Sequence, residues 1–241
     1  EKNLHAFELG RWAVLHLREA QKLLAPSLIK LPQTLDEKIA TRADHLKAYQ
    51  GRRLLKRYLA LVSKIENPEL KEAVAKAYHK LLTYKDEYEV ARLHRLTRAK
   101  AAEQFENIDR IIYHLAPPLL SKLGPDGRPL KRQFGAWIEK VFGVLARFKF
   151  LRGTPFDVFG YSVERRMERD LIKQYEADLA ALVFSDGRDD IAALRELAEL
   201  PLQIRGFGPV KYSNYEKAAK RRLELLDVLR NPPPTVTQAA E

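Results

Sequence analysis

Cationic side chains stand beside glycine turns at two places in the sequence. Arg152 precedes one turn and Arg205 precedes the other, and Arg165, Arg166 and Lys211 follow further along the chain. A guanidinium presents a planar fork of N–H donors that matches the oxygens of a carboxylate or a phosphate. These five residues are therefore the candidates for an anion-binding or partner-binding pocket built by the turns.

Acidic neighbours offer the same cations a different role. Asp157, Glu164 and Glu168 lie close to them in sequence. Pairing with these carboxylates would lock the loops and leave no pocket. Charged residues near turns commonly act as such clamps, so we favour the clamp over the pocket. Both interpretations stay open on the sequence alone.

The usual sequence signals of catalysis are missing. No two of the six histidines have the His-Glu-x-x-His spacing of a zinc helix. Gly206-Phe207-Gly208 opens like a dinucleotide loop, but Lys211 stands where the third glycine would be. We interpret this segment as a structural turn, with an anion nest as the alternative. The sequence therefore predicts no catalytic, cofactor-binding or metal-binding residue in this segment.

Composition narrows the class of protein. The 241 residues are 46% hydrophobic and 31% charged, which suits a globular chain with a sizeable core. There is no cysteine, so disulfides, thiolate zinc sites and cysteine-ligated clusters are excluded within it. No apolar run approaches the roughly 20 residues of a membrane span, and no signal-peptide pattern opens the sequence. We expect a cytoplasmic protein.

The charge of the chain keeps a second class of function open. A formal net charge of +11 raises attraction to nucleic acid, anionic membranes or an acidic protein partner. Basic clusters lie at 52–57, 92–100, 165–169 and 220–222. Most of the Lys and Arg residues of the whole chain lie in helical patterns beside Asp or Glu, which favours a solvated, mildly basic surface. A basic helical nucleic-acid-binding module is therefore the alternative hypothesis.

Capping signals predict a long helical hairpin near the N-terminus. Thr34 and Glu37 fit a capping box, and apolar residues recur at helical spacing from there to Val62. Asn67 followed by Pro68 begins a second helix that continues past residue 90. Two long helices joined by a short turn should pack antiparallel.

A wide apolar face runs from Phe134 to Leu151, which predicts a buried central helix at 134–151. The patterns together predict an all-α fold of about seven or eight helices. We expect a helical linker at 1–33 that joins an upstream domain, a helical domain at 34–230 and an extended tail at 231–241.

Several ungapped stretches, taken in order, resemble one known family. They are Tyr84–His94, His114–Leu120, Leu151–Tyr161 running on into Glu164–Arg166, and Ile204–Lys211. In this order they resemble the C-terminal domain of indolepyruvate ferredoxin oxidoreductases, which are 2-oxoacid:ferredoxin oxidoreductases. The resemblance spans roughly residues 34 to 230.

The resemblance implies a parent enzyme that oxidatively decarboxylates arylpyruvates to acyl-CoA thioesters. Thiamine diphosphate and [4Fe-4S] clusters would serve that enzyme from other segments and pass electrons to ferredoxin. The domain would follow a gamma-type oxidoreductase domain, in a beta subunit or a fused chain. No catalytic residue is implied here, so we expect a structural or docking domain that partners the thiamine-dependent subunit or domain.

Overall fold

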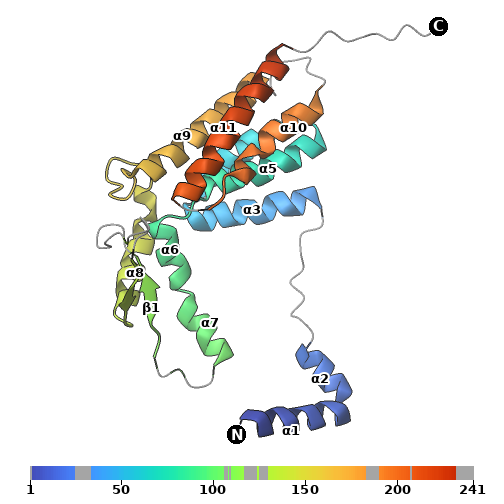
Figure 1. Cartoon of the computed structure of the whole chain (residues 1–241), viewed down its shortest axis with the longest axis vertical. Helices are drawn as coiled ribbons and strands as arrows, with labels where there is room; N and C mark the ends of the chain where they lie inside the picture. The colour runs from blue at the N-terminus through green and yellow to red at the C-terminus, as the bar shows by residue number, and fades with distance from the viewer. Residues whose placement is uncertain are drawn as a thin grey trace, which may run out of the picture. The chain divides into compact units, whose positions relative to one another are not determined.

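The computed structural model describes residues 2–24, 34–105, 108, 110–116, 124, 130–182, 190–206 and 208–231. Helices make up nearly all of the regular structure in these residues, and the sheet found there has two strands (Figure 1). The all-α prediction is confirmed. The chain forms two compact units, residues 1–38 and 39–241. Most of the predicted tail, residues 232–241, and residues 25–33 lie outside the described residues.

The first unit has little core of its own. It holds α1 (Lys2–Leu15), α2 (Leu17–Leu24) and the start of α3 (Leu35–Tyr49). Among its described residues only Ala20 is buried. The predicted capping box begins α3: the Glu37 backbone N–H donates to Thr34 Oγ1 at 3.2 Å, and the Thr34 N–H donates to the Glu37 carboxylate at 3.3 Å.

The second unit contains the remaining helices and the sheet. In chain order they are α4 (Arg52–Val62), α5 (Pro68–Leu82), α6 (Glu87–His94), α7 (Thr97–Gln104), β1 (Tyr113–Leu115), β2 (Arg132–Phe134), α8 (Ile138–Arg147), the 3-10 helix η1 (Phe148–Leu151), α9 (Val163–Leu182), α10 (Ile191–Glu199), the 3-10 helix η2 (Leu200–Gln203) and α11 (Pro209–Arg230). The described part of 34–230 therefore holds nine α-helices, α3 to α11, where seven or eight were expected. In those same described residues, no helix is long and apolar enough to cross a membrane.

Two helix breaks explain the larger number. Gly51 separates α3 from α4 with a φ of +107°, a conformation open mainly to glycine. Asp86 begins α6 by accepting a hydrogen bond from the Glu89 N–H at 2.8 Å, which separates α6 from α5. The predicted hairpin is present as α4 and α5. Asn67 caps α5 as expected, with its Oδ1 accepting from two backbone N–H groups at 3.0 Å.

The larger core is built around α5, which buries eight of its fifteen residues. The ring of Tyr78 stacks between those of Tyr58 from α4 and Tyr175 from α9, at centroid distances of 6.0 and 5.9 Å. Helices α9, α10 and α11 complete this core, and Figure 1 shows them bundled with α5. Helices α4, α5, α9, α10 and α11 thus close their apolar faces on one another.

The prediction of a buried central helix at 134–151 is wrong in its extent and in its burial. Phe134 lies in β2, opposite Tyr113 of the antiparallel strand β1, so α8 begins only at Ile138. Phe142 is buried in a second, smaller core with α6 and β1, but Trp137 is 59% exposed. Helical periodicity identifies an apolar face, but it does not show whether residues of the same chain bury that face.

Candidate functional site

Arg152 lies inside the protein. Its guanidinium forms a bidentate ion pair with Asp86, in which Nε donates to Oδ2 and Nη2 donates to Oδ1 at 2.9 Å. Neither side chain is more than 3% exposed. The guanidinium also lies 3.7 Å from the Tyr49 ring centroid and donates to the Tyr49 carbonyl at 3.3 Å. A buried ion pair persists only when its hydrogen bonds are met, and this arrangement meets them. The Arg152 fork is therefore occupied from within.

The turn after Arg152 is held by hydrogen bonds of its own. Asp157 accepts from the Gly153 N–H at 2.9 Å and from the Tyr88 hydroxyl at 3.2 Å. Gly153 has a φ of +76°. A Cβ at Gly160 would stand 2.6 Å from the Asp157 carboxylate, so only glycine fits there without a shift. We call Tyr49, Asp86, Tyr88, Arg152 and Asp157 the Arg152 clamp.

A second polar cluster joins α9 to the start of α11. The Lys211 ammonium lies 2.8 Å from the Glu164 carboxylate and also pairs with Glu168, which in turn pairs with Arg165. The side chains of Lys211 and Arg165 are only 14% and 13% exposed. Arg165 stands 5.5 Å from the Tyr84 ring centroid, which links this Glu168 cluster to the segment between α5 and α6. In this cluster the cations pair with carboxylates of the same domain, as the clamp interpretation predicts.

Arg166 and Arg205 face solvent. Arg166 is exposed, and its side chain pairs with none of the residues that the structure describes. Arg205 is also exposed, and its Nε donates to the Leu202 carbonyl at 2.8 Å. Its own carbonyl accepts from the Asn214 side chain at 2.9 Å. The five candidate cations therefore do not share one open anion site in the described part of the chain.

Lys80 holds the turn between η2 and α11 against α5. Its ammonium donates to the carbonyls of Pro201 at 2.5 Å and Ile204 at 2.9 Å. Burial, together with the positive charges of Arg205 and Lys211, lowers the pKa of Lys80 to about 8. Sequence analysis did not single out this residue, because its acceptors lie more than a hundred positions away.

Two histidines meet where α3 approaches α5. His45 Nδ1 and His79 Nε2 lie 2.9 Å apart, so one ring donates to the other. Burial, with the charges of His45 and Arg42, lowers the pKa of His79 to about 4. Within the described residues, no group of three or more potential ligands is placed to hold a metal ion.

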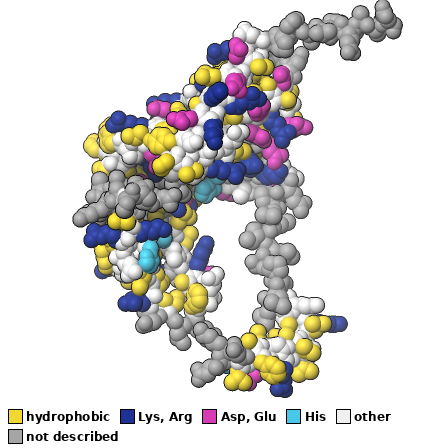
Figure 2. Space-filling model, viewed as in Figure 1, with side chains coloured by type: hydrophobic (Ala, Val, Ile, Leu, Met, Phe, Trp, Pro, Cys, Tyr) yellow, Lys and Arg dark blue, Asp and Glu magenta, His cyan; other side chains and the backbone are white. Residues whose placement is uncertain are grey.

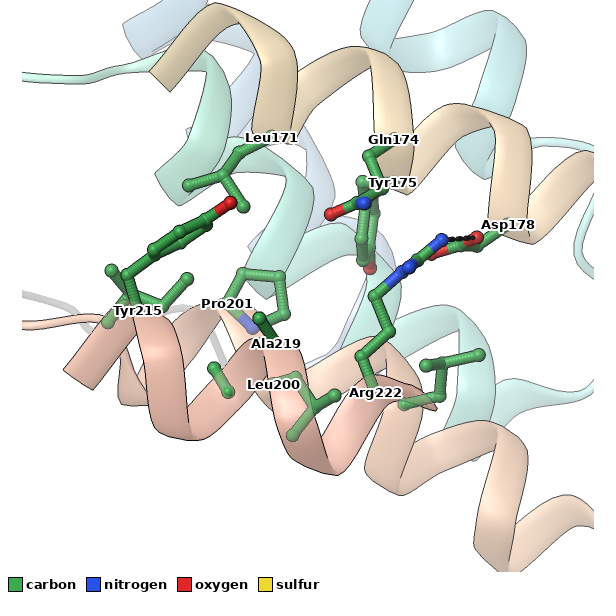
Figure 3. Close-up of a pocket in the computed structure, with 12 residues that line it drawn as sticks. Leu171, Gln174, Tyr175, Asp178, Leu200, Pro201, Tyr215, Ala219 and Arg222 are labelled. Carbon is green, nitrogen blue, oxygen red and sulfur yellow. Dashed lines mark hydrogen bonds and ion pairs between the residues drawn. The ribbon is translucent and has the colours of Figure 1, made fainter. Parts of the chain in front are cut away.

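A small pocket lies between α9, η2 and α11 (Figure 3). Tyr175 and Pro201 line its apolar part, and Tyr215 stands at one side. The ion pair of Asp178 with Arg222 closes another side, at 2.6 and 2.5 Å. A cavity of about 40 Å³ holds water-sized guests, so thiamine diphosphate or CoA does not fit in it.

Opposite charges are interspersed on the face of the second unit shown in Figure 2. Every predicted basic cluster has at least one cation in an ion pair, as in Arg57 with Glu176, Arg98 with Glu139, Arg165 with Glu168 and Arg221 with Glu196. A phosphate-binding face needs an uninterrupted positive strip. The carboxylates interrupt the strip at each of these places.

These features define a class of domain: an all-α unit whose turns are fastened by buried ion pairs. The chain belongs to a family of unknown function, DUF6537, whose model matches residues 35–224. No curated protein and no solved structure matches the chain. The Arg152 clamp and the Glu168 cluster both lie within the matched residues.

Proposed function

We propose that this chain is a structural, docking domain of an indolepyruvate-type 2-oxoacid:ferredoxin oxidoreductase, and that it is not itself catalytic. The parent enzyme would act in the cytoplasm and convert arylpyruvates to acyl-CoA thioesters. Support for that parent comes from the resemblance of the four stretches described above. Its thiamine diphosphate and [4Fe-4S] clusters would be held by other segments, since this sequence has no cysteine to ligate a cluster.

One observation supports the structural role: the stretches that resemble the family form ion pairs with one another. Asp86 of the first stretch pairs with Arg152 of the third, and Lys211 of the last pairs with Glu164. A catalytic group needs a free donor or lone pair directed at a substrate, whereas these groups are used in internal bonds. Part of the second stretch, residues 117–120, lies outside the described residues.

The alternative, a basic helical nucleic-acid-binding module, has the net charge of +11 in its favour. Such a module would concentrate cations on one face, but acidic residues pair with cations in each basic cluster. The docking role fits this distribution better, because a mixed surface allows a specific partner rather than any polyanion.

Co-expression tests the proposal. A tagged version of the chain is produced together with the thiamine-dependent subunit or domain of such an oxidoreductase, and the product is sized by light scattering. We expect one complex with the summed mass of the two chains. Separate elution, combined with micromolar, length-dependent binding to DNA or RNA that falls steeply with salt, would support the nucleic-acid module instead.

A further inference from the structure

Helix α8 is apolar over a wider arc than its own unit covers. Its inward face, with Phe142 at the centre, packs on α6 and β1 (Figure 1). A helix on the surface of a globular protein usually needs an apolar stripe of about 100°. Beyond that face lie Val141 and Val144 of α8, together with Trp137 directly before the helix and Phe148 directly after it at the start of η1; they are 37%, 53%, 59% and 42% exposed. We call these four residues the α8 seam.

The seam has the spacing of a helix-pairing surface. Its residues follow one another at steps of four, three and four, as the a and d positions of a coiled-coil heptad do. In that register Lys140 and Arg147 occupy successive g positions, where charged residues choose the partner. Both are exposed, and neither side chain pairs with a described residue.

The charge beside the seam has one sign. Glu139 is the only acidic residue between positions 130 and 151. Its carboxylate accepts from Arg98 at 3.3 Å and from the Tyr113 hydroxyl at 3.1 Å. In the heptad register Glu139 occupies an f position, on the side of the helix away from the seam. Within α8, the open flank of the seam therefore carries cations and no acidic residue.

We propose that the α8 seam is the docking surface for an acidic amphipathic helix of a partner protein. Apolar residues of that helix would pack between the seam side chains, and its carboxylates would face Lys140 and Arg147. The α8 seam would be the place where the docking role proposed above is carried out. The inference rests on that proposed function in one respect, that the domain has a protein partner.

Other occupants fit less well. A second copy of the chain has no acidic residue on its seam to oppose these cations. A helix that lies in a membrane surface needs both flanks of its apolar face free to meet headgroups. One flank of the seam is closed, because Ile138 is buried and Leu145 packs on the smaller core. A folded protein partner needs only the open side.

A designed peptide tests the proposal on the whole chain. The probe is a three-heptad helix with Leu at a and d and Glu at e and g, and its twin carries Lys in place of Glu. Trp12→Phe makes Trp137 the only tryptophan of the chain, so its emission reports contact. We expect a blue shift on titration with the Glu peptide and at least tenfold weaker binding of the Lys peptide.

Two variants sharpen the result. Lys140→Glu with Arg147→Glu should reverse the preference and favour the Lys peptide. Val144→Asp should weaken both peptides at least tenfold, while Val228→Asp, at a similarly exposed valine on α11, should leave them unchanged. Circular dichroism checks that each variant keeps its helices.

Several outcomes would overturn the proposal. The first two are the absence of an emission shift with the Glu peptide and equal binding of the two peptides after charge reversal. The third is binding of the chain to phosphatidylserine vesicles or to oligonucleotides, if Val144→Asp abolishes that binding. The fourth is a dimer of the chain that Val144→Asp dissociates. The titration uses no oxidoreductase subunit. Its failure is therefore distinguishable from failure of the co-expression test.

Discussion

The two cores of the second unit differ in how completely their apolar helices are buried. In the larger core, α5 is enclosed by α4, α9 and α10, and the buried tyrosines of α4 and α9 form hydrogen bonds within the chain. Tyr58 donates to the Ala75 carbonyl at 3.1 Å, and Tyr175 donates to the Ala198 carbonyl at 3.1 Å. In the smaller core, α8 buries one face and leaves aromatic side chains of another in solvent. The first core is complete, and the second presents a surface for contact.

The Arg152 clamp lies at the junction of these regions. Tyr49 ends α3 on the side of the larger core, Asp86 begins α6, and Arg152 directly follows η1, which continues from α8. A rigid connection of this kind would hold the α8 seam in a fixed position relative to the larger core. We therefore expect substitutions of buried residues to lower the free energy of unfolding strongly, and substitutions of exposed residues to change it little.

The largest effect is expected from Asp86→Ala. It leaves the Arg152 guanidinium buried without its carboxylate, and removal of one partner of a buried pair costs about 3–5 kcal/mol. Urea unfolding of the chain measures this loss. The double variant Asp86→Leu with Arg152→Met should recover most of it, because it removes both charges. Additive losses in the double variant would contradict the coupling.

The next largest effect is expected in α8, where the loss of stability should differ between a buried residue and a seam residue. Phe142→Ala should cost about 3 kcal/mol of unfolding free energy, because Phe142 is buried between His94 and Tyr113. Val144→Ala, on the seam, should cost no more than about 0.5 kcal/mol in the isolated chain. Equal losses for the two variants would show that the seam is covered within the chain.

The burial of His79 on α5, beside His45, makes the stability of the domain sensitive to acid. An unfolded histidine titrates near pH 6.5, and His79 in the folded protein has a pKa of about 4. Between these values the unfolded state binds more protons, so the free energy of unfolding should fall by about 1–2 kcal/mol from pH 7 to pH 4.5. His79→Gln should remove this part of the slope in urea unfolding. An unchanged slope would place the acid sensitivity elsewhere.

The smallest effect is expected at the exposed pair of Lys173 with Asp170, whose side chains are 74% and 70% exposed. Lys173→Ala should change the unfolding free energy by no more than about 0.5 kcal/mol, because solvent screens such pairs. A loss comparable to that of Asp86→Ala would mean that exposure is a poor guide to the strength of ion pairs in this domain.

Local signals predicted the helix starts well. The capping box at Thr34 and the cap at Asn67 are present as the sequence indicates, because capping depends on neighbours within three residues. The start of α11 at Pro209 was missed, because the preceding Gly206-Phe207-Gly208 was interpreted only as a turn.

Long-range pairing could not be predicted from the sequence. Asp86 pairs with Arg152, sixty-six positions away, whereas the acidic partners considered from the sequence were Asp157, Glu164 and Glu168. Asp86 followed three residues later by Glu89 is a capping signal that would have located the start of α6. Nothing in the local sequence identifies Arg152 as its partner. The exposure of Trp137 was equally hidden, because periodicity does not say which apolar face meets a partner.

The central claim is that Arg152, Arg165 and Lys211 hold the turns of the domain in place and that the candidate cations do not form a ligand-binding pocket. Arg152→Ala with Arg205→Ala in the parent oxidoreductase that we propose tests it most directly, through the unfolding temperature and the KM values for oxoacid, CoA and ferredoxin. We predict a clear loss of stability, mainly from Arg152, with unchanged KM values in the folded fraction. Unchanged stability with a raised KM for any of the three would contradict the account and establish the pocket.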